Sequence, residues 1–287
     1  MSRNRERMGG VQQHDSSPPP QMMQNEGGGG TGFSFVVPTE FVELPSEGRF
    51  YPPGHPLHGE TSIEIRQMTA KEEDMLTSRT LLKKGVALDR VIENLIVDRR
   101  IDPHSLLIGD RNAIIIATRV AGYGSDYNTK ITCPACAETQ EYSFDLNKAR
   151  IHNGVGGEEL SITANGDGTF DIKLPRTEVV VTFRLLTGAD EKKLLDGVES
   201  DRKQKTHERN VTRQIVNIAV AVNGDASADA INYLVQNIPS MDARHLRLAY
   251  KLVAPNIDLT QEFVCSECDT EHQLEVPLSA DFFWPDR

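Results

Sequence analysis

All four cysteines of this 287-residue chain occur in two Cys-x-x-Cys pairs that lie far apart in the sequence. The first pair is Cys133 and Cys136, and the second is Cys265 and Cys268, with residues 137–264 between them. A Cys-x-x-Cys turn directs two sulfurs to one ion, so two such turns complete a tetrahedral four-sulfur shell. The pattern therefore predicts one structural metal site that joins two remote parts of the chain.

The segments around both pairs predict β-hairpins with a cysteine knuckle at each tip. Lys130-Ile-Thr leads into the first knuckle and Glu141-Tyr-Ser-Phe-Asp leaves it, and Glu262-Phe-Val and Gln273-Leu-Glu-Val repeat this arrangement. Closing so long a loop costs roughly 4 kcal/mol, whereas a structural zinc ion supplies on the order of 10 kcal/mol. The long separation is therefore compatible with a shared site.

Zinc is the metal that we expect, because it is prevalent in four-cysteine sites, although iron binds the same ligand set. His272, four residues after Cys268, is the one substitute ligand that the spacing offers. Three other interpretations of the cysteines stay open: buried small apolar side chains, a redox pair at Cys133-Pro-Ala-Cys136, and disulfides. Disulfides need an oxidising compartment, and we expect no signal peptide in this sequence.

Composition limits the classes of function. The formal net charge is −11 and the pI is near 5.2, which opposes binding to a phosphate backbone as the main activity. The longest apolar runs, such as Ala113-Ile-Ile-Ile-Ala, are too short to cross a bilayer. We therefore expect a water-soluble protein of cytoplasmic origin that neither spans a membrane nor depends on nucleic acid.

The expected fold class is α+β, with helical segments packed against small β-hairpins and a split, zinc-ribbon-like site. Pro18–Pro20 and Gly27–Gly30 mark the beginning of the chain as low in complexity and poor in residues that can be buried. We divide the chain into a disordered tail (1–36), an extended segment with helices (37–125), the first knuckle with β-hairpins (126–186), a helical segment (187–255), and the second knuckle with an aromatic C-terminus packed on the first knuckle (256–287).

Local signals place the first elements. Glu60–Met68 alternates as a half-buried strand, and Thr69-Ala-Lys-Glu72 has the spacing of a capping box, so a helix should begin there and end before Lys83-Lys84-Gly85. A second helix is expected from about Leu88, with Val91, Ile92, Leu95 and Ile96 on one face. A third is expected after Asp110, ending at Gly122.

The middle of the chain predicts strands and the next part predicts helices. Strands are expected at 158–164, 169–174 and 178–186, with a turn at Asn165-Gly-Asp-Gly168. That turn could suggest a calcium loop, but the other loop ligands are missing. From Gly188 to Leu252 the apolar residues follow helical spacing, with Ala219 and Val222 placed on a helix face.

No known catalytic motif is found. The chain has no phosphate-binding Gly-x-x-x-x-Gly-Lys loop, no His-Glu-x-x-His motif and no Gly-x-Ser-x-Gly elbow. His55 and His58 lie three residues apart in a turn rich in proline and glycine, which is a weak indication of a metal site. We therefore expect no catalytic and no cofactor-binding residues other than the four metal ligands, and we expect that the protein is not an enzyme.

Several short motifs together resemble the baseplate hub subunit family of T-even-type contractile-tailed bacteriophages, in the branch with cysteine knuckles. The motifs are Leu44-Pro-Ser-Glu-Gly-Arg-Phe-Tyr-Pro, Met68-Thr-Ala-Lys-Glu-Glu-Asp-Met-Leu, Leu82-Lys-Lys-Gly, Gly109-Asp-Arg-Asn-Ala, Tyr123-Gly-Ser-Asp-Tyr, both knuckles and Phe282-Phe-Trp-Pro. The resemblance covers most of residues 41–287. It implies a virion protein of the central baseplate, or a factor that assembles it in the host cytoplasm, with other baseplate and tail proteins as partners.

Other interpretations stay open. The rival function is a zinc-ribbon adaptor or regulator that binds nucleic acid or another protein, and the one remaining enzyme class is a thiol oxidoreductase. Pairing with further copies of the chain within the baseplate is also open. The aromatic end, Phe282, Phe283 and Trp284, is expected to lock into the core, with contact to a neighbouring protein as the alternative.

Overall fold

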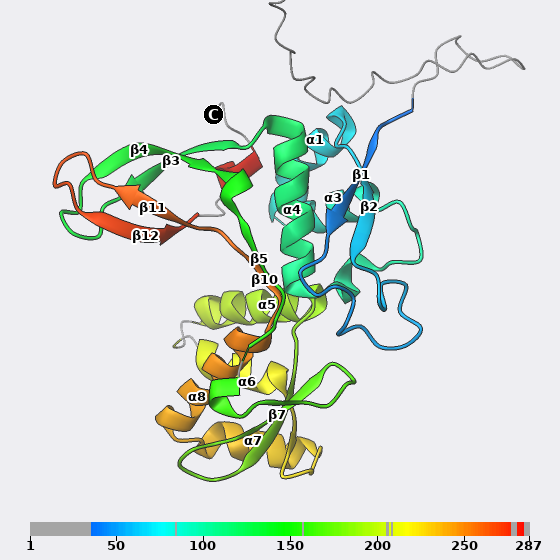
Figure 1. Cartoon of the computed structure of the whole chain (residues 1–287), viewed down its shortest axis with the longest axis vertical. Coiled ribbons are helices and arrows are strands. Elements are labelled where there is room, and N and C mark those ends of the chain that lie inside the picture. Colours follow the sequence, from blue (N-terminus) through cyan, green and yellow to red (C-terminus); the bar gives the residue numbers. More distant parts are fainter. Residues whose placement is uncertain are drawn as a thin grey trace, which may run out of the picture. The chain divides into compact units, whose positions relative to one another are not determined.

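The computed structural model describes residues 36–83, 85–156, 158–204, 207, 209–276 and 280–283. The chain divides into two units, Met1–Pro38 and Thr39–Arg287, and every described helix and strand belongs to the second (Figure 1). The tail predicted at 1–36 lies outside the described residues except for Val36. None of the described helices is long and apolar enough to cross a bilayer.

The described chain is a mixture of helices and small antiparallel sheets, as the sequence predicts. The α-helices are α1 (Ala70–Thr77), α2 (Arg79–Lys83), α3 (Ala87–Leu95), α4 (Ile108–Tyr123), α5 (Gly188–Gln204), α6 (Asn210–Ile218), α7 (Ala228–Asn237) and α8 (Ser240–Val253). Four 3-10 turns are η1 (Pro103–Ser105), η2 (Leu146–Lys148), η3 (Glu158–Leu160) and η4 (Ala280–Phe283).

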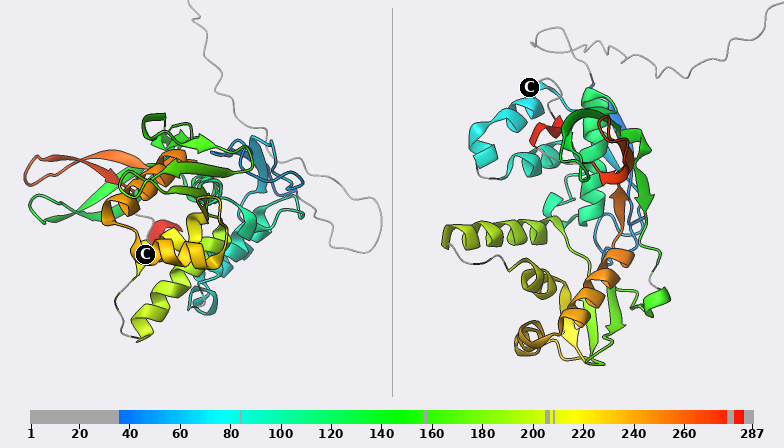
Figure 2. Two further views of the ribbon diagram at one scale, coloured as in Figure 1. Left: turned by 90° about the horizontal axis from the view of Figure 1, so that it is seen from below. Right: turned by 90° about the vertical axis from the view of Figure 1, so that its left-hand side faces the viewer.

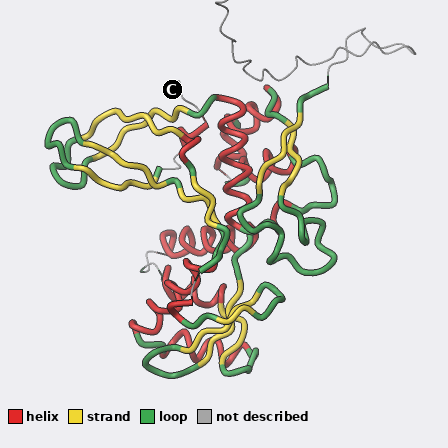
Figure 3. The backbone as a smooth tube through the Cα atoms, in the orientation of Figure 1, coloured by secondary structure: helices red, strands yellow, loops and turns green. Residues whose placement is uncertain are grey.

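Twelve strands form five sheets in the described residues (Figure 3). The strands are β1 (Thr39–Glu43), β2 (Ser62–Arg66), β3 (Asp126–Thr132), β4 (Thr139–Asp145), β5 (Arg150–His152), β6 (Thr163–Ala164), β7 (Thr169–Lys173), β8 (Val180–Arg184), β9 (Ala219–Val222), β10 (Asn256–Asp258), β11 (Thr260–Val264) and β12 (Glu271–Glu275). The pairs β1–β2, β3–β4, β5–β10 and β11–β12 are two-stranded sheets, and β6–β7–β8–β9 is the four-stranded one.

The capped helix predicted after residue 68 is present as α1. Thr69 is its N-cap, and the Glu72 carboxylate accepts hydrogen bonds from the Thr69 amide (3.1 Å) and hydroxyl (2.5 Å). The helix breaks at Ser78, and the short α2 continues to Lys83. In α3 the predicted apolar face is buried, which confirms the expected helix.

Helix α4 begins earlier than predicted, and its surroundings explain why. It starts at Ile108, so that Asp110 lies in its first turn rather than before it. The buried Asp110 carboxylate accepts from the Ser46 amide (2.9 Å), the Ser46 hydroxyl (2.6 Å) and the Tyr51 hydroxyl (2.7 Å). These bonds fix the segment between β1 and β2 on the start of α4.

The four-stranded sheet corrects one predicted helix. Ala219 and Val222, placed on a helix face by their spacing, lie in β9, which follows α6 directly. Val222 pairs with Val181 of β8, so β9 covers an edge of the sheet that would otherwise be open. Ala219 and Val222 are three residues apart, a spacing that also occurs on one face of a helix. Here the pairing with the distant strand β8 determines the structure instead of the local helical spacing.

The strand predicted at 158–164 is also largely wrong. Residues Glu158–Leu160 form the 3-10 turn η3, and only Thr163–Ala164 form a strand. Ser161 lies between them in the left-handed region, at φ 54°, which interrupts an extended chain. The turn predicted at 165–168 is confirmed, since the Asn165 amide donates to Thr169 and joins β6 to β7.

Candidate metal centre

The four cysteine sulfurs converge on one point at the tips of two hairpins. All four Sγ atoms lie within 4.8 Å of one another. Across the hairpins, Cys133 and Cys268 are 3.8 Å apart and Cys136 and Cys265 are 3.7 Å apart. A tetrahedron with metal–sulfur bonds of about 2.3 Å has sulfur–sulfur edges of about 3.8 Å. The arrangement therefore fits a four-sulfur metal ion, and the two pairs that are remote in sequence meet.

Each knuckle has the same backbone geometry, which accounts for how a short loop presents two sulfurs. The Ala137 amide donates to the Cys133 carbonyl at 2.9 Å, and the Asp269 amide donates to the Cys265 carbonyl at 3.0 Å. Ala137 and Asp269 occupy equivalent positions, one residue after the second cysteine, and both have positive φ angles of 62° and 53°. The repeated turn is a property of the knuckle rather than of its particular side chains.

The hairpins predicted on both sides of the knuckles are confirmed. Strand β3 pairs with β4 from Asp126↔Asp145 to Thr132↔Thr139, and β11 pairs with β12 from Thr260↔Glu275 to Val264↔Glu271. The two hairpins lie side by side in each view (Figures 1 and 2). We call this pair of hairpins, residues 126–145 and 260–276, the knuckle arm.

Contacts along the knuckle arm hold the hairpins together away from the sulfurs. The Gln261 side chain donates to the Asp145 carbonyl (2.8 Å) and accepts from its amide (3.2 Å). The Tyr142 hydroxyl donates to the Glu262 carbonyl at 2.8 Å, and the Tyr142 ring packs edge-on against Phe263 with centroids 5.1 Å apart. These contacts align the two hairpins with each other. The four thiols therefore lie close together through protein contacts as well as through any shared metal ion.

One further link lies next to the sulfurs. The amide and hydroxyl of Ser266, inside the second knuckle, both donate to the Gln140 side-chain oxygen of β4 at 2.9 Å. Gln140 follows Cys136 by four residues, so this bond joins the two knuckles beside the candidate ligands. Such bonds orient ligand loops in metal sites.

The environments of the four thiols differ. Cys133 and Cys265 are buried, and Cys136 and Cys268 are exposed. The Thr270 hydroxyl, 3.2 Å from Cys268 Sγ, lowers the pKa of that thiol to about 6. The Glu138 amide lowers the pKa of Cys136, but desolvation and the neighbouring sulfurs outweigh it and raise that pKa to about 12. The pKa values of the two exposed thiols are therefore shifted in opposite directions by their local surroundings.

The histidines considered as ligands do not join this cluster. In the described residues the four cysteines alone form a metal-binding group, and His272 lies on β12 opposite Phe263. His55 Nε2 bonds to the Ser105 hydroxyl at 2.9 Å, while His58 Nδ1 bonds to the Tyr51 carbonyl at 2.7 Å. The weak indication of a metal site at His55 and His58 therefore finds no support.

Sequence reasoning missed Arg119, the buried residue that fixes the base of the knuckle arm. Its guanidinium donates to the Gly124 carbonyl (2.6 Å), the Asp126 carbonyl (3.1 Å) and the Phe282 carbonyl (2.6 Å). Phe282 is buried and packs edge-on against Tyr127 of β3, with ring centroids 5.2 Å apart. The expected packing of the aromatic end in the core therefore holds for Phe282 and Phe283, and Trp284 lies outside the described residues.

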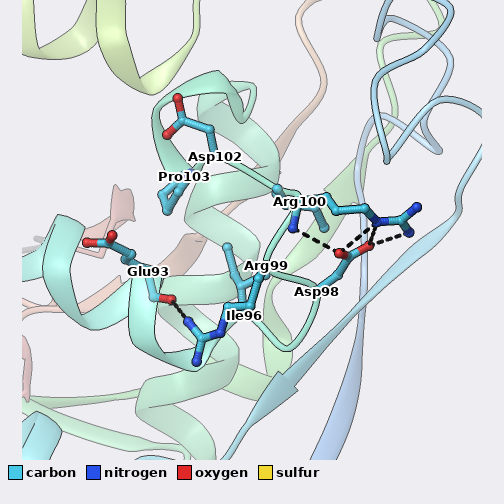
Figure 4. Close-up of a pocket in the computed structure, with 8 residues that line it drawn as sticks. Glu93, Ile96, Asp98, Arg99, Arg100, Asp102 and Pro103 are labelled. Atoms are coloured by element: carbon cyan, nitrogen blue, oxygen red, sulfur yellow. Dashed lines mark hydrogen bonds and ion pairs between the residues drawn. The ribbon is translucent and has the colours of Figure 1, made fainter.

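A surface pocket lies elsewhere, against the loop after α3 (Figure 4). Its volume is about 280 Å³, and its polar groups are already engaged. The Arg100 guanidinium donates to both carboxylate oxygens of Asp98, and the Arg99 guanidinium donates to the Glu93 carbonyl at 2.8 Å. Among the residues that line it there is no pair of nucleophile and base, so the pocket offers no catalytic arrangement.

Residues 38–284, which contain both hairpins and the whole of α1 to α8, match the family described as T4 bacteriophage base plate protein. The chain belongs to this family. Neither the curated proteins nor the solved structures include a match to it. Membership makes the chain a structural component of a phage baseplate, located in the tail of the virion and in contact with other baseplate proteins.

The motif at residues 109–112 now has a structural meaning. A side chain at Gly109 would collide with the Pro255 carbonyl, because an added Cβ would lie 2.0 Å from that oxygen. Asp110 holds the segment at Ser46, and Arg111 forms ion pairs with Asp89 (2.7 Å) and with Glu191. Asn112 donates to Asn256 at 3.1 Å. All four residues therefore contact segments that are distant in the sequence.

Proposed function

We propose that this chain is a structural or assembly component of the baseplate hub, in which one zinc ion bound by Cys133, Cys136, Cys265 and Cys268 fixes the knuckle arm. The convergence of four sulfurs from two remote hairpins is the observation that carries this proposal. A closed shell of four thiolates leaves no open coordination position, which is typical of structural rather than catalytic zinc. When bound, the ion supplies folding free energy.

The physical demand on a hub protein favours such a clamp. A baseplate component must keep its shape while the tail assembles and contracts around it. The two hairpins are joined through residues 146–259, and separation of the hairpins would break the metal shell as well as the Gln140–Ser266 link. The metal ion thus raises the free energy of local unfolding of the knuckle arm.

The alternative function, a zinc-ribbon adaptor that binds nucleic acid, is disfavoured by charge. The chain carries a formal charge of −11. In the knuckle arm, Lys130 is the one lysine or arginine, while carboxylates are numerous at its exposed positions, for example Glu138, Glu267 and Asp269. An acidic ribbon repels a phosphate backbone, so its contacts should be to proteins.

A cryo-EM map of the assembled tail tip tests the location. We expect density for this chain in the central hub, with a compact peak between the two knuckles that disappears when tails are assembled with a Cys133→Ser/Cys268→Ser chain. Density at the baseplate periphery would contradict the hub assignment. Absence of the chain from mature tails would leave only a role in assembly.

A further inference from the structure

Helix α8 carries a second ordered surface that the fold itself does not use. Its inward residues, Ala243, Leu246, Ala249 and Val253, are all buried. Their spacing of three, three and four residues is that of one helix face. The buried Asp242 adds hydrogen bonds from the Arg176 and Thr177 amides at the start of the helix. In Figure 1, α8 lies at the outer edge of the group formed by α6, α7 and β7.

The outward face of α8 alternates apolar and basic residues. Met241 and Leu248 are 53% and 46% exposed, and Arg244 and Lys251 are exposed between and after them. The positions 241, 244, 248 and 251 are separated by three, four and three residues, which is the a/d spacing of a helix that pairs with another helix. We call these four residues the α8 seam.

The charge of the α8 seam is opposite to that of the whole chain. Neither Arg244 nor Lys251 forms an ion pair with a described residue, although the chain has a formal charge of −11. Arg176 extends the basic surface beside Met241, since its Nε lies 3.4 Å from the Met241 sulfur. Two carboxylates lie nearby. Asp242 is buried and accepts from the Arg176 and Thr177 amides, and the pKa of Asp258 is lowered first by Thr260 and last by Lys251.

We propose that the α8 seam is a docking surface for a helix of another baseplate protein, with apolar residues opposite Met241 and Leu248 and acidic residues opposite Arg244 and Lys251. From Met241 to Lys251 the seam covers ten residues, which is about 15 Å of helix axis. A partner helix of three turns therefore suffices. This proposal rests on membership of the baseplate family and is independent of the metal site.

The residues of the α8 seam favour an acidic helix over nucleic acid and over a second copy of α8. Nucleic acid would satisfy the arginine and lysine but would leave Met241 and Leu248 against phosphate, where they gain nothing. A second copy of α8 supplies no carboxylate, because every polar member of the seam is basic. A parallel copy sets cation against cation, and an antiparallel copy sets the cations against Met241 and Leu248, so neither neutralises Arg244 and Lys251. Burial of the two apolar side chains and neutralisation of the two cations require an acidic, amphipathic helix.

Photo-crosslinking in infected cells tests the occupant directly. The probe is a full-length chain with p-benzoylphenylalanine at position 248, supplied to a phage that lacks the gene. The matched control has the same probe at position 195, because Leu195 of α5 is 61% exposed and lies outside the seam. We expect a protein adduct from position 248 alone, mapped to an acidic amphipathic helix of another baseplate protein. An adduct to nucleic acid or to a second copy, or incorporation into tails without any adduct, overturns the proposal.

Charge reversal supplies the second test. Arg244→Glu/Lys251→Glu should lower the yield of the position-248 adduct and of infectious particles by roughly tenfold or more, because acidic residues then face acidic residues. Lys192→Glu/Lys203→Glu makes the same change of charge on the exposed face of α5 and should leave both yields unchanged. The thermal unfolding temperature of each purified variant shows that it is folded. Equal loss in both variants, or no loss in the first, contradicts a specific seam.

Discussion

At the scale of single residues, buried carboxylates connect segments that are distant in sequence. Asp110 is fully buried and satisfies the Ser46 amide, the Ser46 hydroxyl and the Tyr51 hydroxyl at once. The Tyr51 hydroxyl in turn accepts from the Leu107 amide at 3.1 Å. Burial raises the pKa of Asp110, so its hydrogen bonds offset a real desolvation cost.

Replacement of Asp110 should therefore be severe. Asp110→Ala leaves the Ser46 amide and the Tyr51 hydroxyl buried without their acceptor, and we expect the free energy of unfolding to fall by about 3 kcal/mol. Chemical denaturation of the purified chain measures it. Asp229→Ala, an exposed carboxylate in the first turn of α7, is the control and should change stability by less than about 0.5 kcal/mol. Similar values for the two variants would show that the Asp110 network contributes little.

Asp190 gives the fold a predictable response to acid. Burial raises the pKa of Asp190, but the Arg184 guanidinium (2.8 Å) and the Thr187 amide outweigh it and hold that pKa at about 2. The pKa of an aspartate in an unfolded chain is about 3.9. The stabilisation by Asp190 is therefore complete above about pH 4 and is lost as the pH falls toward 2.

Asp190→Asn should lower the free energy of unfolding at pH 7 by about 2 kcal/mol and flatten its decline between pH 4 and pH 2. Urea denaturation at a series of pH values checks both effects. A control at Asp196, exposed on the same helix, should keep the decline of the parent chain. An unchanged acid profile in Asp190→Asn would mean that other carboxylates cause the decline.

Residues of the candidate site differed in how far the sequence could predict them. The four cysteines were predictable because the chemistry of a metal shell imposes a short, recognisable spacing. The roles of Arg119 and Asp110 could not be predicted, because the sequence pattern of a helix does not show whether a charged residue on it is exposed or buried. In retrospect, an arginine that follows the apolar run Ala113–Ala117 in α4 was the available signal.

At the scale of elements, the knuckle arm makes a symmetric prediction. Cys133→Ser and Cys268→Ser each remove one ligand, from different hairpins, of the same four-sulfur shell. We expect each variant to lose bound metal and to show the same decrease in thermal unfolding temperature. Ser143→Ala, at an exposed position of β4, should change neither property. Loss of metal in one cysteine variant only would indicate that the two hairpins do not share an ion.

Elements with strong local signals were predicted well, and those defined by distant pairing were not. The capping box located α1, and the alternating flanks located β3, β4, β11 and β12. By contrast, β9 exists because Val222 and Ala221 pair with β8, although residues 185–218, which include α5 and α6, separate the two strands in the sequence. Nothing in Ala219-Val-Ala-Val distinguishes that strand from the end of α6, since local periodicity does not report on distant partners.

At the scale of the whole molecule, the two proposals concern separate parts of the chain. The four sulfurs lie together at the tips of the knuckle arm, and the α8 seam lies on a helix whose inward residues are buried. The family was predictable from short motifs, and two of them, residues 109–112 and the segment at Ser46, bond to each other through Asp110. The α8 seam could not be predicted from the sequence. An apolar residue that faces outward has the same helical spacing as one that faces the core, and only the structure distinguishes the two.

The central claim is that four sulfurs from two remote hairpins bind a single zinc ion. X-ray absorption at the zinc edge, combined with metal content per purified chain, tests it most directly. We predict one zinc ion per chain with four sulfur neighbours at about 2.3 Å and no nitrogen neighbour. Two metal ions per chain, or a shell of two sulfurs completed by other atoms, would contradict the shared site.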